Sequence, residues 1–217
     1  SLKESLTEGG QIPFDSNMVM HDFLKISHPT ILHIAFKALN DFIAQKSSLP
    51  KPWDVADSDA FLEIAQEVAK TIKDYNSTED KKFESVLRRF SFTCQGVFSP
   101  MAAFMGGYLA QEAIKAITQK FMPTQQFFYT DCCEVIPELP ETKEELATAI
   151  QSLGVEEKKD RSDGLRICVG SQLLEEIQYT NLFMVGAGAI GCELLKNYAM
   201  LGIGTGNAGV NGRKQGG

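Results

Sequence analysis

The chain has 217 residues, of which 43% are apolar and 23% are charged, and its formal net charge is −7. This composition supports one or two domains with a hydrophobic core, and the acidic balance argues against non-specific nucleic-acid binding. No apolar run of 18 residues occurs, which argues against a membrane span, and five cysteines without disulfide-like spacing indicate reduced thiols in the cytoplasm or nucleus.

The first part of the chain predicts a helical bundle. Residues 1–22 show no clear periodicity and lack an initial Met, so we expect them to be the end of an upstream domain. Within residues 23–96, apolar residues recur at helical spacing from Pro29 to Ile43, from Phe61 to Ile72 and from Phe83 to Phe90. Three amphipathic helices joined by short loops are typical of a bundle. The expected N-caps are Asp57, Ser58 or Asp59 for the second helix, and a capping box of Ser77 and Asp80 for the third.

The middle of the chain, residues 97–140, predicts a helix followed by a strand. Ser99-Pro100 is typical of a helix start, and the uncharged residues 101–110 suggest that its first half is buried. We expect Pro123 to end this helix. Residues 125–136, which are rich in aromatic side chains, predict a strand.

Residues 141–168 alternate acidic and basic side chains and predict a solvated connector. It would hold one short helix, which Thr142 and Glu145 cap at its start and Gly154 closes at its end. Residues 205–217 contain five glycines and almost no apolar side chains, so we expect a flexible tail.

A glycine-rich turn in residues 169–204 carries the clearest chemical signal. The apolar run 182–185 predicts a strand buried on both faces, and residues from Ile190 onward predict a helix. Between them lie the candidate nucleotide-binding residues Gly186, Ala187, Gly188, Ala189 and Gly191.

Each glycine of this turn has a separate expected role. Gly186 would permit the tight turn, Gly188 would let a phosphate or ribose approach the backbone, and Gly191 would let helix and strand pack closely. The helix N-terminus would offer N–H groups to an anion. The motif alone does not separate ATP from a nicotinamide dinucleotide, and no acidic residue for a ribose follows Glu193. A packed turn without a ligand remains the structural alternative.

Other reactive side chains predict neither a nucleophile nor a metal site. Cys192 lies in the first turn of the predicted helix, where a thiol pKa can fall, but a buried structural role is favoured. Cys132 and Cys133 are adjacent in the predicted strand and fit neither zinc nor redox spacing. The spacings of the three histidines and a nearby aspartate fit no metal template; these residues are His21, Asp22, His28 and His33.

Four strings resemble the ubiquitin-activating enzymes. Residues 183–197 resemble the active adenylation half of that family closely, and Arg161 to Leu165 is similar to a segment preceding it, with Ser162 in place of Tyr. Residues 99–123 resemble the end of the inactive adenylation half, and residues 23–92 are similar to the family's four-helix insertion. The resemblance extends from Asp22 to Gly204.

The resemblance implies an α/β fold with a helical bundle. In order, it implies a tail of an upstream domain (1–22), the four-helix-bundle insertion (23–96), the C-terminal part of the inactive Rossmann-like half (97–140), a connector (141–168), the first strand-turn-helix of the active half (169–204) and a tail (205–217). It also implies ATP and Mg²⁺ as cofactors, with the glycine-rich turn contacting ATP. The family adenylates the C-terminus of ubiquitin or a ubiquitin-like protein and passes it, as a thioester, to a conjugating enzyme. A monomeric enzyme in the cytoplasm and nucleus is expected.

The sequence departs from the family from Thr205 onward. The family's next strand, with its ribose-binding aspartate, does not follow, nor do the catalytic-cysteine and ubiquitin-fold domains. We therefore expect an internal fragment that is inactive on its own. A non-catalytic product with residual protein binding and a truncated nicotinamide dehydrogenase are the alternatives, and the coding sequence beyond Gly204 would separate them.

Overall fold

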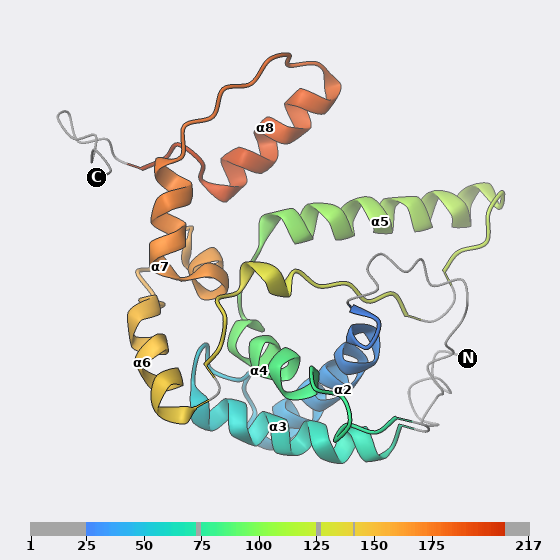
Figure 1. Cartoon of the computed structure of the whole chain (residues 1–217). Helices are drawn as coiled ribbons and strands as arrows, with labels where there is room; N and C mark the ends of the chain where they lie inside the picture. The colour runs from blue at the N-terminus through green and yellow to red at the C-terminus, as the bar shows by residue number, and fades with distance from the viewer. Residues whose placement is uncertain (1–24, 73–74, 125–126, 141, 207–217) are drawn as a thin grey trace. The chain divides into compact units, whose positions relative to one another are not determined.

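The computed structural model describes residues 25–72, 75–124, 127–140 and 142–206 (Figure 1). These ranges contain seven α-helices, α2 to α8, and the 3-10 helix η2 (Cys133–Val135), and no strand is formed within them. No helix among them combines the length and apolar character that a bilayer span requires. The predicted segment 1–22 and most of the predicted tail lie outside the described residues.

The chain divides into two compact units. Unit 1 comprises residues 1–95 and 108–139, and unit 2 comprises residues 96–107 and 140–217. The helix α5 (Ser99–Thr118) contributes its first half to unit 2 and its second half to unit 1.

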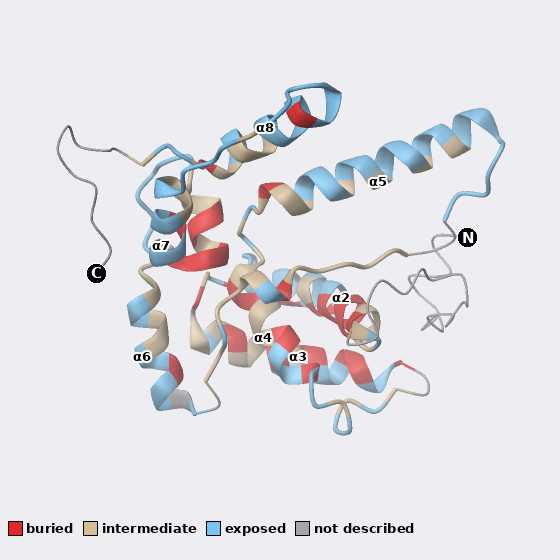
Figure 2. Ribbon diagram, turned by 45° about the horizontal axis from the view of Figure 1, so that its top comes forward, coloured by how far each residue is buried: buried red, intermediate tan, exposed pale blue. Residues whose placement is uncertain are grey.

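Three helices pack together to form the core of unit 1, which confirms the predicted bundle. They are α2 (His28–Lys46), α3 (Val55–Lys70) and α4 (Phe83–Thr93). Their apolar stripes meet in one cluster, and Figure 2 shows buried residues on all three helices. The side chains of this cluster that are at most 3% exposed are Ile31, Ile34, Ala35, Ala38, Phe42, Phe61, Ala65, Ala69, Val86 and Leu87.

The helix starts in unit 1 differ from the predicted caps. Asp54 caps α3, since its carboxylate accepts a hydrogen bond from the Asp57 backbone N–H at 2.8 Å. Trp53, which precedes Asp54, has a left-handed backbone conformation with φ 55°, so the helix cannot extend further toward the N-terminus. The predicted capping box of Ser77 and Asp80 is wrong, because α4 begins at Phe83 without a side-chain cap.

The predicted strand at 125–136 is wrong in its described part, residues 127–136. A strand requires a hydrogen-bonded partner strand, and the described chain supplies none. Instead the segment is bonded to α2 through side chains. The Tyr129 hydroxyl lies 2.8 Å from His33 Nδ1, and the Asp131 carboxylate lies 2.9 Å from His28 Nδ1.

Helix α5 starts at Ser99 as predicted, but it is largely exposed. Ser99 is the one residue of this helix that is buried, while Phe104 is 48% and Leu109 is 69% exposed. The expectation that residues 101–110 are buried is therefore wrong for this chain. The helix ends at Thr118, before the predicted stop at Pro123, because Gln119 adopts a left-handed conformation with φ 55°.

Unit 2 contains α6 (Lys143–Leu153), α7 (Asp163–Tyr179) and α8 (Ala189–Leu201) around a smaller core. Helix α6 has both predicted ends: the Thr142 hydroxyl accepts from the Glu145 N–H, and Gly154 is left-handed with φ 59°. Helix α7 was not predicted, and Gly170 interrupts it with φ 78°. The buried cluster of this unit consists of Leu165, Cys168, Val169 and Leu174.

Candidate functional site

The glycine-rich turn lies between an irregular segment and α8. The predicted strand at 182–185 is not formed, and two of its side chains are open to solvent, with Phe183 91% and Val185 86% exposed. A strand buried on both faces requires neighbouring strands and covering helices, and the described residues provide neither. The helix that follows the turn is formed as predicted and begins at Ala189.

The three glycines of the turn occupy three different backbone environments. Gly186 has φ 90°, a conformation that side chains rarely adopt. A Cβ at Gly191 would lie 2.6 Å from the Gly186 carbonyl oxygen, so only glycine permits this close approach. Gly188 has an ordinary φ of −73°, and a Cβ there would meet no described atom within 4 Å. The space beside Gly188 is therefore open to an approaching group.

The start of α8 presents uncapped backbone N–H groups. Gly188 is the N-cap residue, and it makes no side-chain cap hydrogen bond to the N–H groups of the first turn. The backbone N–H groups of a first helical turn carry partial positive charge and favour an anion. Cys192 lies in this turn and is exposed, so the expectation of a buried packing role is wrong. Its thiol donates to the Ala187 carbonyl oxygen at 3.4 Å.

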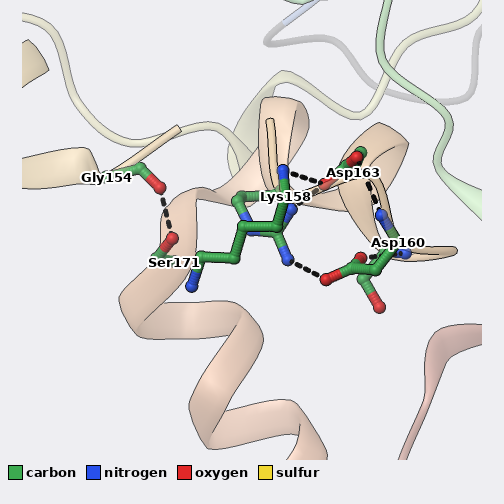
Figure 3. Close-up of polar contacts among 7 residues, drawn as sticks. Gly154, Lys158, Asp160, Asp163 and Ser171 are labelled. Atoms are coloured by element: carbon green, nitrogen blue, oxygen red, sulfur yellow. Dashed lines mark hydrogen bonds and ion pairs between the residues drawn. The ribbon is translucent and has the colours of Figure 1, made fainter. Parts of the chain in front are cut away.

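A polar cluster surrounds the start of α7 and overlaps the string from Arg161 to Leu165 (Figure 3). The Asp163 carboxylate accepts the backbone N–H groups of Lys158 and Asp160, each at 3.1 Å. Desolvation acts to raise the pKa of Asp163, but these hydrogen bonds and the nearby Arg166 lower it below its usual value. Arg166 is 3% exposed and pairs with Asp160 at 2.9 Å and with Asp163.

Arg161 connects this string to α8. Its Nη2 donates to the Ala199 carbonyl oxygen at 2.6 Å, in the last turn of the helix that starts at the glycine-rich turn. The same carbonyl also accepts the Gly202 N–H at 3.2 Å, and a cation at a helix C-terminus complements the helix dipole. The polar string therefore positions α8 from its far end. Sequence reasoning missed these contacts, although Asp163 and Arg166 have the i, i+3 spacing of a helical ion pair.

A cleft of about 430 Å³ lies beside the same polar cluster. Its walls include Lys158, Arg166, Leu174 and Tyr179, and none of the five predicted nucleotide-binding residues lines it. The cleft is therefore separate from the glycine-rich turn.

The buried thiols are poorly suited to nucleophilic attack. Burial raises the pKa of Cys94 and of Cys168 to about 11, and burial together with the Asp131 charge raises that of Cys133 to about 12. Burial also raises the pKa of the half-buried Cys132. Because the thiolate is the reactive species, these side chains react slowly at neutral pH.

One group of possible metal ligands forms in unit 1. His28, Asp131 and Cys133 bring their ligand atoms within 4.8 Å of one another. The sequence spacing had given no reason to group them. His33 bonds Tyr129 instead, and the other two residues considered from the sequence, His21 and Asp22, lie outside the described residues.

Curated relatives match nearly the whole chain, and a family model matches its first 69 residues. Residues 1–69 match the family model of the ubiquitin-activating enzyme E1 four-helix bundle. Ubiquitin-like modifier-activating enzyme 1 of Oryctolagus cuniculus is 41% identical over 209 residues, which are 96% of this chain and 18% of that protein. Ubiquitin-activating enzyme E1 1 of Schizosaccharomyces pombe is 38% identical over 96% of this chain and 19% of its own length. Ubiquitin-like modifier-activating enzyme 6 of Homo sapiens is 36% identical over 85% of this chain and 16% of its own. The chain thus spans less than a fifth of the length of these relatives.

Proposed function

Because this chain is homologous over nearly its whole length to a segment of the ubiquitin-activating enzymes, we propose that it is part of an ATP-dependent enzyme of that family. Such an enzyme activates the C-terminal carboxylate of ubiquitin, or of a ubiquitin-like protein, as an acyl adenylate. A catalytic cysteine then takes the acyl group as a thioester for a conjugating enzyme. The partners of the whole enzyme would be these two proteins, with ATP and Mg²⁺ as cofactors. Five free cysteines are consistent with an enzyme of the cytoplasm and nucleus.

The role of this segment would be to hold ATP phosphates at the turn before α8. The contacting residues would be Gly186, Ala187, Gly188, Ala189 and Gly191. The observation that carries this proposal is the backbone geometry: Gly186 has a positive φ, Gly191 lies against the Gly186 carbonyl, and the space at Gly188 is open. The uncapped first turn of α8 would supply N–H donors to the phosphates.

The remaining segments would take their family places in the longer protein. Residues 23–96 would be the four-helix-bundle insertion, and residues 97–140 the end of one Rossmann-like adenylation half. Residues 141–168 would connect it to the start of the second half, residues 169–204. In that setting the apolar run 182–185 would pair with neighbouring strands. The exposure of Phe183 and Val185 supports this proposal, because such side chains are stabilised by burial.

The 217-residue polypeptide alone is expected to be inactive. Acyl transfer requires a thiolate, and four of the five thiols have a raised pKa. ATP–pyrophosphate exchange with ubiquitin tests the adenylation step, and a thioester adduct with ubiquitin on a non-reducing gel tests the acyl transfer. Either signal above the background without protein would contradict the expectation.

Direct titration with Mg·ATP tests the proposed turn. The chain should bind ATP more tightly than adenosine, because the donors at the turn recognise phosphate. Gly188→Val should weaken ATP binding at least about tenfold, or by roughly 1.4 kcal/mol. Its added side chain fills the open space without meeting a described atom within 4 Å of the Cβ, so the fold should persist.

Gly107→Ala is the matched control. A Cβ at Gly107 also meets no described atom within 4 Å, but this residue lies in α5, away from the turn in sequence. The control should retain the ATP affinity of the parent chain. Equal ATP affinity in the parent chain and Gly188→Val, or no binding by the parent, would refute the assignment of the turn.

A further inference from the structure

The three-residue group in unit 1 joins two segments that are far apart in the sequence. His28 begins α2, while Asp131 and Cys133 lie at the start of η2, more than 100 residues later. His28 is 7% exposed, the Asp131 side chain 10% and Cys133 9%. The group is therefore an interior arrangement of side chains and not a chance encounter on an exposed surface.

The Asp131 carboxylate is held in a fixed orientation. Its Oδ1 accepts from Lys25 Nζ at 3.0 Å and from the Cys133 backbone N–H at 3.0 Å. Its Oδ2 points to His28 Nδ1 at 2.9 Å. Lys25 and the Cys133 N–H thus hold one carboxylate oxygen, and the other oxygen faces His28. Hydrogen bonds from surrounding residues orient the ligands of metal sites in the same way.

We propose that His28, Asp131 and Cys133 form a binding site for a zinc-class divalent ion. The ligands would be His28 Nδ1, Asp131 Oδ2 and Cys133 Sγ, with water at the fourth position. A mixed set of nitrogen, oxygen and sulfur donors suits Zn²⁺, whereas Mg²⁺ and Ca²⁺ prefer oxygen alone. Nothing in the proposed adenylation chemistry uses these three residues, so the site is independent of the glycine-rich turn.

The distances between the ligand atoms require only small changes. In a tetrahedral zinc site, bonds of about 2.0–2.3 Å place the ligand atoms roughly 3.5 Å apart. The ligand atoms here lie within 4.8 Å of one another, so side-chain rotations would have to bring the most distant pair up to about 1 Å closer. His28 Nδ1 and Asp131 Oδ2, now 2.9 Å apart, would have to separate by roughly 0.5 Å.

Metal binding would release a proton from Cys133. A cysteine thiol is ordinarily S–H at neutral pH, and Cys133 is only 9% exposed. On binding, the sulfur–hydrogen bond is replaced by a sulfur–metal bond, and the proton passes to the buffer. His28 would shift its proton to Nε2 and exchange its hydrogen bond with Asp131 for a bond to the metal.

Co²⁺ and Zn²⁺ titrations of the 217-residue chain test the proposal. Co²⁺ should bind one ion per chain and produce a thiolate-to-cobalt charge-transfer band in the near ultraviolet. Zn²⁺ should displace the cobalt, and calorimetry in two buffers of different ionisation enthalpy should detect at least one proton released per ion. Cys133→Ser should abolish the charge-transfer band, and His28→Gln should weaken binding by about tenfold or more.

Cys94→Ser is the matched control. Cys94 is another partly buried thiol with a raised pKa, and it bonds the Pro50 and Ser91 carbonyl oxygens, outside the proposed site. This variant should keep the band, and circular dichroism should show the same helix content in all variants. No thiolate band in the parent chain, or a band that survives Cys133→Ser, would overturn the proposal. A band lost only in Cys132→Ser would overturn it as well.

Discussion

At the scale of single residues, Asp131 remains charged in a largely buried position because several donors converge on its carboxylate. Desolvation by itself would raise its pKa. Hydrogen bonds from His28, from the Cys133 backbone N–H and from Lys25 outweigh that effect and hold the pKa well below its usual value. The charge therefore links the segment before η2 to the start of α2.

The lowered pKa sets the pH range in which Asp131 stabilises the fold. The carboxyl has a pKa of about 3.9 in an unfolded chain and a lower one in the folded chain. Its contribution is therefore fully present above that unfolded value and is lost as the pH falls toward the folded value. Asp131→Asn should lower the free energy of unfolding by about 2 kcal/mol at neutral pH, as expected for losing charged hydrogen bonds.

Urea unfolding followed by circular dichroism, at neutral pH and again below pH 3, measures this effect. The difference between Asp131→Asn and the parent chain should shrink in acid. Glu134→Gln is the control, because Glu134 also pairs with Lys25 but its side chain is 63% exposed. Such an exposed pair contributes about 0–1 kcal/mol. An equal loss of stability in both variants would contradict the role given to burial.

At the scale of elements, α6 owes its start to a local cap. The Thr142 hydroxyl accepts from the Glu145 N–H and donates to the Glu145 carboxylate at 2.8 Å. Thr142→Ala should destabilise α6 by about 1 kcal/mol, which is typical of a lost N-cap. Hydrogen exchange should then speed up in the first turn of α6.

Thr148→Ala in the middle of the same helix is the control. Thr148 is exposed and bonds only within the helix, to the Glu144 carbonyl oxygen. Alanine has the higher helix propensity, so this variant should exchange no faster than the parent. If both substitutions accelerate exchange alike, capping does not set the stability of α6.

Local signals explain which elements could be predicted from the sequence. Both ends of α6 and the apolar stripes of α2 to α4 depend on residues close together in the chain. Helix α7 was missed because Gly170, with φ 78°, interrupts it and shifts the phase of its apolar pattern. The expected strands failed for another reason, since pairing depends on partner strands that the described residues do not contain.

The candidate sites show the same difference between local features, which the sequence predicts, and long-range contacts, which it does not. The expected backbone freedom of Gly186 and the tight packing of Gly191 agree with the structure, because a turn's geometry is set within a few residues. The grouping of His28 with Asp131 spans 103 residues, and no spacing in the sequence could indicate it. Only the tertiary contact of the segment before η2 with the start of α2 creates that group.

At the scale of the whole molecule, the two units bury very different amounts of apolar surface. Unit 1 has a core of fifteen buried residues, whereas the cluster in unit 2 has four. On α8, Ile190 is 80% and Met200 is 59% exposed. Backbone amides in α2 and α3 should therefore exchange most slowly, and those in α8 should exchange within the earliest times of a hydrogen–deuterium experiment.

Phe61→Ala extends this prediction. This substitution should lower the free energy of unfolding of unit 1 by about 3–5 kcal/mol, because the side chain is fully buried. Exchange in α2 to α4 should accelerate, while exchange in α8 should not change. Acceleration of equal size in α8 would mean that the two units unfold as one.

The sole tryptophan of the chain gives unit 1 an intrinsic optical reporter. Trp53 is 4% exposed and stacks on Phe92, with ring centroids 5.1 Å apart and an angle of 15° between the ring planes. Its fluorescence emission should shift to longer wavelength when the bundle opens and water reaches the indole. Emission should stay unchanged while α8 frays, so fluorescence and helix content should give separate melting curves.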